Sequence, residues 1–179
     1  MTQVGNVYGQ ALYSLVKDER LDSVVLEELQ VLKKSFSDEP GFVKLLAAAN
    51  LSKDERCQIL DECFRGKIQP YVLNFLKILT EKGYIRQFAD CCETFEAQYN
   101  EDHGILPVKV VTAIALTAEQ AEKLTKKLSG ITGKTVMIEN QVDAGCMGGV
   151  RLDFDGKRLD DTVAHRLEAI GSLLKNTVL

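Results

Sequence analysis

The chain has few of the residues on which catalysis or metal binding usually depends. Its 179 residues include two histidines, three prolines and no tryptophan. The five cysteines, an odd number, contain no Cys-x-x-Cys pair, which argues against a disulfide framework and against a zinc site. Neither His103 nor His165 has a cysteine or histidine at ligand spacing. We therefore expect no bound metal and no cofactor.

Long apolar runs and an excess of one charge sign are also missing. No stretch approaches the roughly 20 apolar residues of a membrane-spanning helix, and the first residues resemble neither a signal peptide nor an organelle leader. The net charge is −4, with lysine and arginine dispersed among the acids, so the sequence offers no basic stripe for nucleic acid. A hydrophobic content of 45% is typical of a globular protein. We expect a cytoplasmic protein without a membrane span.

Residues 1–104 show the periodicity of six amphipathic helices joined by short turns, which predicts a helical bundle. Ser52 and Glu55 have the spacing of a capping box, and Pro70 suits the first turn of a fifth helix expected over 71–80. That fifth helix is apolar around most of its circumference. It is either a central core helix or one wall of a groove for an amphipathic helix from another protein. Periodicity leaves both interpretations open.

Residues 105–179 predict a small mixed sheet in the order strand, helix, strand, strand, helix. Apolar and polar residues alternate over 105–116 and 150–154, and a second strand is expected over 135–139. Asp155-Gly156 supplies a hairpin turn into Lys157–Leu159. Asp160 or Asp161 is expected to cap a last helix, whose apolar face would consist of Val163, Leu167, Ile170 and Leu174. The predicted fold class is α+β, mostly α, with domains 1–104 and 105–179.

Three segments resemble chemical sites, but each has a simpler structural interpretation. Gly145–Gly149 precedes a strand, whereas a phosphate-binding loop opens a helix. Gly133-Lys134-Thr135 lacks the earlier glycine of that loop. The aspartates at 153, 155, 160 and 161 are accounted for by a solvated strand face and a helix start. With no acid-base pair and no activated nucleophile, we expect a non-catalytic protein.

The C-terminal pattern resembles the signature of the delta subunit of F-type ATP synthases, whose mitochondrial relative is the oligomycin-sensitivity-conferring protein. Its positions here are Gly148, Gly149, Gly156, Asp160, Thr162 and Leu167. Two further motifs resemble the first and fifth helices of that family, namely Tyr8-Gly-Gln-Ala11-Leu12 and the segment 74–83. The resemblance covers nearly the whole chain and suggests a bacterial member. Gly9 departs from the alanine common in the family, at a cost in helix propensity of about 1 kcal/mol.

The resemblance implies a non-catalytic stator subunit, peripheral on the cytoplasmic face of the cell membrane, that serves rotary ATP synthesis and ion transport. The helical domain would receive the N-terminal helix of the alpha subunit of the catalytic head. The second domain would bind the b subunits of the peripheral stalk. The residues implied for the alpha-subunit groove are Tyr8, Ala11, Leu12, Phe75, Leu76 and Leu79.

Two other classes of protein share parts of this pattern. An RNA-binding module could use the C-terminal sheet, but the strands contain only Phe154 as an aromatic, on their apolar face. A helical adaptor unrelated to ATP synthase could bind some other amphipathic helix along the fifth helix. Composition alone does not separate this adaptor from a stator subunit, and only the three motifs disfavour it.

Overall fold

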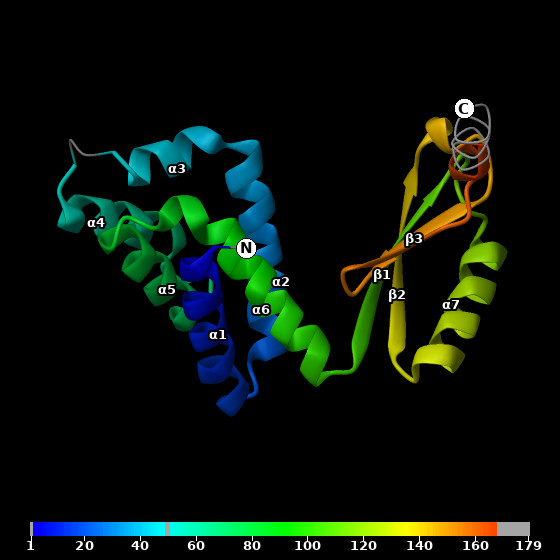
Figure 1. Ribbon diagram of the computed structural model, residues 1–179. Coiled ribbons are helices and arrows are strands. Elements are labelled where there is room, and N and C mark those ends of the chain that lie inside the picture. Colours follow the sequence, from blue (N-terminus) through cyan, green and yellow to red (C-terminus); the bar gives the residue numbers. More distant parts are fainter. Residues whose placement is uncertain (1, 49–50, 168–179) are drawn as a thin grey trace. The chain divides into compact units, whose positions relative to one another are not determined.

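The computed structural model describes residues 2–48 and 51–167. The chain divides into two compact units, Met1–Tyr99 and Asn100–Leu179, and the division falls inside a helix (Figure 1). The sequence instead placed the boundary after residue 104, where the first strand begins. None of the helices in the described ranges is long and apolar enough to cross a membrane.

The first unit is built from helices. They are α1 (Gln3–Asp18), α2 (Asp22–Asp38), α3 (Pro40–Leu46), α4 (Lys53–Phe64), α5 (Pro70–Glu81), the 3-10 helix η1 (Ile85–Gln87) and α6 (Phe88–Asp102). Their starts follow local chemistry. The predicted capping box is present at Ser52, whose hydroxyl accepts the Glu55 N–H while the Glu55 carboxylate accepts the Ser52 N–H. Pro70 occupies the first turn of α5, where its missing N–H costs no helical hydrogen bond.

The core of this unit surrounds α5. Six of its twelve residues are buried: Val72, Leu73, Phe75, Leu76, Leu79 and Thr80. They pack with buried residues of α1, α2 and α6, including Val16, Leu29 and Phe95. Of the two interpretations of the all-round apolar helix, burial supports the central one.

Helices α1 and α6 approach closely at two glycines. A Cβ atom at Gly5 would lie 2.8 Å from Cβ of Asp90, and one at Gly9 would lie 2.6 Å from the backbone oxygen of Cys91. Heavy atoms do not pack at such distances, so a side chain at either position would push α1 away from α6. The close approach of α1 to α6 therefore explains why glycine stands at position 9 in spite of its poor helix propensity.

The second unit is a four-stranded mixed sheet with one long helix. Its elements are β1 (Ile105–Thr112), α7 (Ala118–Thr132), β2 (Thr135–Val142), the 3-10 helix η2 (Ala144–Cys146), β3 (Val150–Phe154) and β4 (Lys157–Asp160). The strand order is β2-β1-β3-β4, with β1 and β2 parallel and the other neighbours antiparallel. Leu124 and Leu128 of α7 pack on one face of the sheet, against Leu106, Val108, Val110 and Val136.

Strand lengths differ from the sequence expectation. The strand predicted over 105–116 ends at Thr112, because the Thr112 hydroxyl donates to the Ile114 carbonyl at 2.7 Å and turns the chain. Strand β2 continues past Glu139 to Val142. Strand β4 is the returning strand of the predicted hairpin and extends one residue past Leu159. Alternation alone could not locate these ends, because it does not record the hydrogen bonds that stop or extend a strand.

The last helix begins at Val163 and is described as far as Leu167. Val163 and Leu167, two members of the predicted apolar face, are both exposed in this part of the chain. Ile170 and Leu174, the other members of that predicted apolar face, lie outside the described residues.

Candidate functional site

The residues proposed for the alpha-subunit groove lie mostly in the interior of the first unit. Leu12, Phe75, Leu76 and Leu79 are buried core residues. Tyr8 is half-buried against Tyr84, with ring centroids 5.9 Å apart, and Ala11 is exposed. Most residues of the two family motifs therefore belong to the core of the first unit. Four of the six side chains are not open to a partner in this structure.

An exposed apolar row runs along α1 beside these motif residues. Val7 is 58% exposed, Leu15 is 50% exposed, and Ala11 lies between them. Positions four apart lie on the same face of a helix, so the three side chains form one strip, which we call the α1 row. Helix α5 packs beside α1 and exposes Ile78 at 45% (Figure 1). The apolar residues of α1 therefore lie on two faces of the helix, one turned to the core and one to solvent.

The hairpin of the C-terminal signature depends on positive φ angles. Asp155 and Gly156, between β3 and β4, have φ angles of 53° and 71°. Two successive residues with positive φ match the twist of a tight antiparallel hairpin, which is why an Asp-Gly pair occurs there. Gly156 is therefore required by backbone geometry.

The other signature residues tie the last helix to the start of β3. A Cβ atom at Gly149, whose φ is +81°, would lie 2.3 Å from the backbone oxygen of Asp161. The Val163 N–H donates to the Gly148 carbonyl at 3.0 Å, and a Cβ at Gly148 would meet the Val163 side chain at 3.5 Å. The Gly-Gly pair thus lets two segments of backbone touch. Leu167 is exposed and takes no part in these contacts.

The cap of the last helix is Thr162, and the prediction of Asp160 or Asp161 was wrong. The buried Thr162 hydroxyl accepts the His165 N–H at 3.3 Å, the contact expected of an N-cap side chain. Asp160 instead accepts from both the N–H and the hydroxyl of Thr162, at 3.0 and 2.7 Å. These two hydrogen bonds lower the pKa of the Asp160 carboxyl below its ordinary value. The aspartate orients the cap, so the signature is structural.

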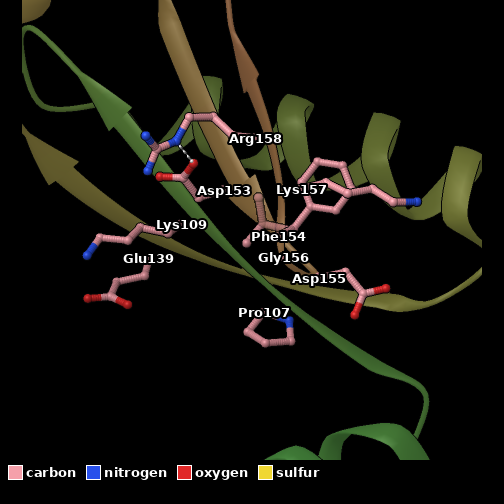
Figure 2. Close-up of a pocket in the computed structure, with 10 residues that line it drawn as sticks. Pro107, Lys109, Glu139, Asp153, Phe154, Asp155, Gly156, Lys157 and Arg158 are labelled. Atoms are coloured by element: carbon pink, nitrogen blue, oxygen red, sulfur yellow. Dashed lines mark hydrogen bonds and ion pairs between the residues drawn. The ribbon is translucent and has the colours of Figure 1, made fainter. Parts of the chain in front are cut away.

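The face of the sheet opposite α7 presents alternating charges. Glu139, Lys109, Asp153 and Arg158 are direct cross-strand neighbours on β2, β1, β3 and β4 in that order, and we call them the charge row. Figure 2 shows these side chains around a hollow, with Arg158 turned to Asp153. The Arg158 Nε lies 2.7 Å from the Asp153 carboxylate, and this contact lowers the pKa of Asp153. Two positive and two negative groups suit a charged protein surface better than a pocket for a single ion.

Metal-ligand clusters, a glycine-rich loop and reactive thiols were the remaining candidates for chemistry in the described ranges. No group of three or more histidine, cysteine or acidic side chains there could hold a metal ion. Gly133 ends α7 in the left-handed conformation with a φ of 68°, so Gly133-Lys134-Thr135 joins a helix end to β2. Burial raises the pKa values of the Cys91 and Cys92 thiols, which keeps both protonated.

Comparison with known proteins identifies the family. The family model described as "ATP synthase delta (OSCP) subunit" matches residues 4–174. A protein named ATP synthase subunit delta from Alkaliphilus oremlandii is 28% identical over 98% of both chains. Another with the same name, from Lacticaseibacillus casei, is 30% identical over 93% of this chain and 92% of its own length.

A solved structure shares the fold. A chain in the structure of the Toxoplasma gondii mitochondrial ATP synthase hexamer superposes with a TM-score of 0.77 at 20% identity, covering 97% of this chain and 98% of that one. This likeness shows the fold, and the match of the family model over residues 4–174 shows that the chain belongs to the ATP synthase delta (OSCP) subunit family.

Proposed function

We propose that this chain, a non-catalytic subunit of an F-type ATP synthase, is the stator link between the catalytic head and the peripheral stalk. Its first unit would bind the N-terminal helix of an alpha subunit, and its second unit the b subunits of the stalk. The complex would place it peripherally on the cytoplasmic face of the cell membrane. Such a link resists the torque of the rotor, and it needs strong binding at two places and no chemistry of its own.

The α1 row supports head binding by the first unit. An amphipathic helix binds through apolar side chains spaced three and four residues apart, and an exposed strip with the same spacing is complementary to it. From Gln3 to Val16, α1 contains no charged residue. Binding there would be driven by apolar burial and would depend little on salt.

Substitutions in the α1 row test this proposal. The titrant is a synthetic peptide of the alpha-subunit N-terminus from the same organism, and the readout is calorimetry with the full chain. Burying the exposed half of a valine or leucine side chain contributes roughly 1–1.5 kcal/mol. Val7→Asp and Leu15→Asp should therefore each weaken binding about tenfold, since 1.4 kcal/mol is a factor of ten.

Val31→Asp is the matched control, because Val31 is 65% exposed on a different helix, α2. Equal loss of affinity in the control, or none in the row variants, would count against the α1 surface. Phe75→Asp and Leu79→Asp are unsuitable here. Both side chains are buried, so a charge there should unfold the unit before it reports on binding.

The charge row supports stalk binding by the second unit. Exposed charges at a protein interface steer association and lose strength with salt. The soluble part of the b subunits should therefore bind the full chain less tightly as salt rises, while the alpha-subunit peptide binds almost unchanged. Lys109→Glu should weaken stalk binding alone. If both partners respond to salt in the same way, the division of roles between the two units is wrong.

A further inference from the structure

A second apolar feature of the first unit is a pocket lined by four elements. It lies among the end of α2, α3, and the junction of η1 with α6, and has a volume of about 570 Å³. Its walls are Phe36, Val43, Ile85 and Phe88. The rings of Phe36 and Phe88 lie 5.1 Å apart between centroids, and both side chains are held in the core. We call this feature the aromatic pocket.

The charged residues that line the aromatic pocket are all positive. They are Lys33, Lys44 and Arg86, and none of the lining residues is acidic although the whole chain carries a net charge of −4. Lys33 pairs with Glu93 at 3.1 Å. Within residues 2–48 and 51–167, the exposed side chains of Lys44 and Arg86 have no hydrogen-bond or ion-pair partner. Asp90, the acid next to this wall on α6, accepts the Thr2 N–H instead.

We propose that the aromatic pocket binds a small anionic amphiphile, a molecule with a hydrocarbon or aryl body and a carboxylate, of which a fatty acid is the simplest. Pockets for small molecules usually measure about 300–1,000 Å³ and combine apolar walls with a few polar groups, as this one does. The hydrocarbon would cover Val43 and the aromatic edges, and Lys44 and Arg86 would face the carboxylate. Because the walls come from three short segments, the pocket is compact, whereas a peptide helix needs an extended groove.

Calorimetric titration of the full chain with sodium dodecanoate, below its micelle concentration, tests this assignment. Saturable one-to-one binding is expected, together with shifts of the Val43 and Ile85 methyl resonances and none at Val110 in the other unit. The neutral amphiphile octyl glucoside should bind at least about fivefold more weakly than octanoate. Shifts spread over both units, or equal binding of the neutral and anionic probes, would overturn the proposal.

Variants at exposed positions locate the site without disturbing the core. Exposed ion pairs contribute about 0.2–1 kcal/mol, so Lys44→Gln and Arg86→Gln should each reduce dodecanoate affinity up to about fivefold. Ala89→Phe, at an exposed lining residue, should fill the pocket and reduce affinity at least tenfold. Lys127→Gln, an exposed lysine on α7, is the control for net charge and should change nothing. Dodecanoate affinity that stays unchanged in Ala89→Phe, or that falls as far in Lys127→Gln as in Arg86→Gln, would contradict the assignment.

Discussion

Replacing Gly9 by alanine should destabilise the first unit, although alanine is the better helix former. The new Cβ would lie 2.6 Å from the Cys91 backbone oxygen and 2.8 Å from the Thr94 Cβ, so α1 has to move away from α6. Overpacking of this kind costs about 1–3 kcal/mol, and contact with rigid backbone favours the upper half of that range. The gain in helix propensity returns about 1 kcal/mol. The expected net loss is roughly 1–2 kcal/mol in the free energy of unfolding.

Buried cysteines allow each unit to be followed separately in the full chain. Cys91 and Cys92 are buried in the first unit and Cys146 in the second. A short pulse of N-ethylmaleimide across a urea series, read by peptide mass spectrometry, gives an unfolding midpoint for each. With a slope of about 1–2 kcal/mol per molar urea, Gly9→Ala should lower the Cys91 and Cys92 midpoint by roughly 0.5–2 M. The Cys146 midpoint is the internal reference.

Gly130→Ala is the matched control. Gly130 lies in α7 and a Cβ there meets nothing within 4 Å, so alanine should stabilise the second unit by about 0.5–1 kcal/mol. The Cys146 midpoint should rise while that of Cys91 and Cys92 stays constant. An unchanged or raised Cys91 and Cys92 midpoint in Gly9→Ala would refute the reasoning, because it would mean that the two helices separate without cost.

Three further predictions concern the signature and the thiols. Thr162→Ala should lower the urea midpoint of Cys146 labelling by the equivalent of about 1 kcal/mol, and Thr162→Ser should preserve it, because serine keeps the capping hydroxyl. The pKa of Asp160 is lower in the folded than in the unfolded chain. The Asp160 carboxylate therefore stabilises the fold above its unfolded pKa of about 3.9, and this stabilisation is lost as the pH falls through the folded pKa. The urea midpoint of Cys146 labelling, followed from pH 7 down to pH 3, should therefore fall less steeply in Asp160→Asn than in the unchanged protein. An equally steep fall would contradict a stabilising role for the Asp160 carboxylate. Burial raises the pKa of Cys91 to about 11, so native protein should be alkylated at the partly exposed Cys63 well before Cys91, and the reverse order would disprove the packing.

Features that depend on a few adjacent residues could be predicted from the sequence. The Ser52 capping box, the proline at the start of α5 and the Asp155-Gly156 hairpin all occur as expected. Each is a local arrangement in which neighbouring residues satisfy one another's hydrogen bonds or φ angles, so no distant segment is needed to specify it. The three family motifs are local patterns as well, so the sequence was enough to indicate the family, and the match of the family model confirms it.

The candidate binding surface could be predicted only in part. The periodicity of the sequence predicts an apolar face on the first helix, but it does not say which apolar residues turn inward when they cover much of the helix. Leu12 turned out to be buried and Val7 exposed. A count of positions four residues apart could have marked Val7, Ala11 and Leu15 as one strip, but its exposure depends on where α5 and α6 pack.

The sequence by itself determined the helical first half, the mixed sheet of the second, the tight turns and the family, because caps, periodicity and glycine φ angles act over a few residues. Only the tertiary structure decided which side of α1 is exposed, why position 9 is glycine, and which side chain caps the last helix. Those outcomes depend on contacts between residues far apart in the chain, such as Gly9 with Cys91 and Gly149 with Asp161. Such close approaches are set by how whole elements pack, which no local pattern records.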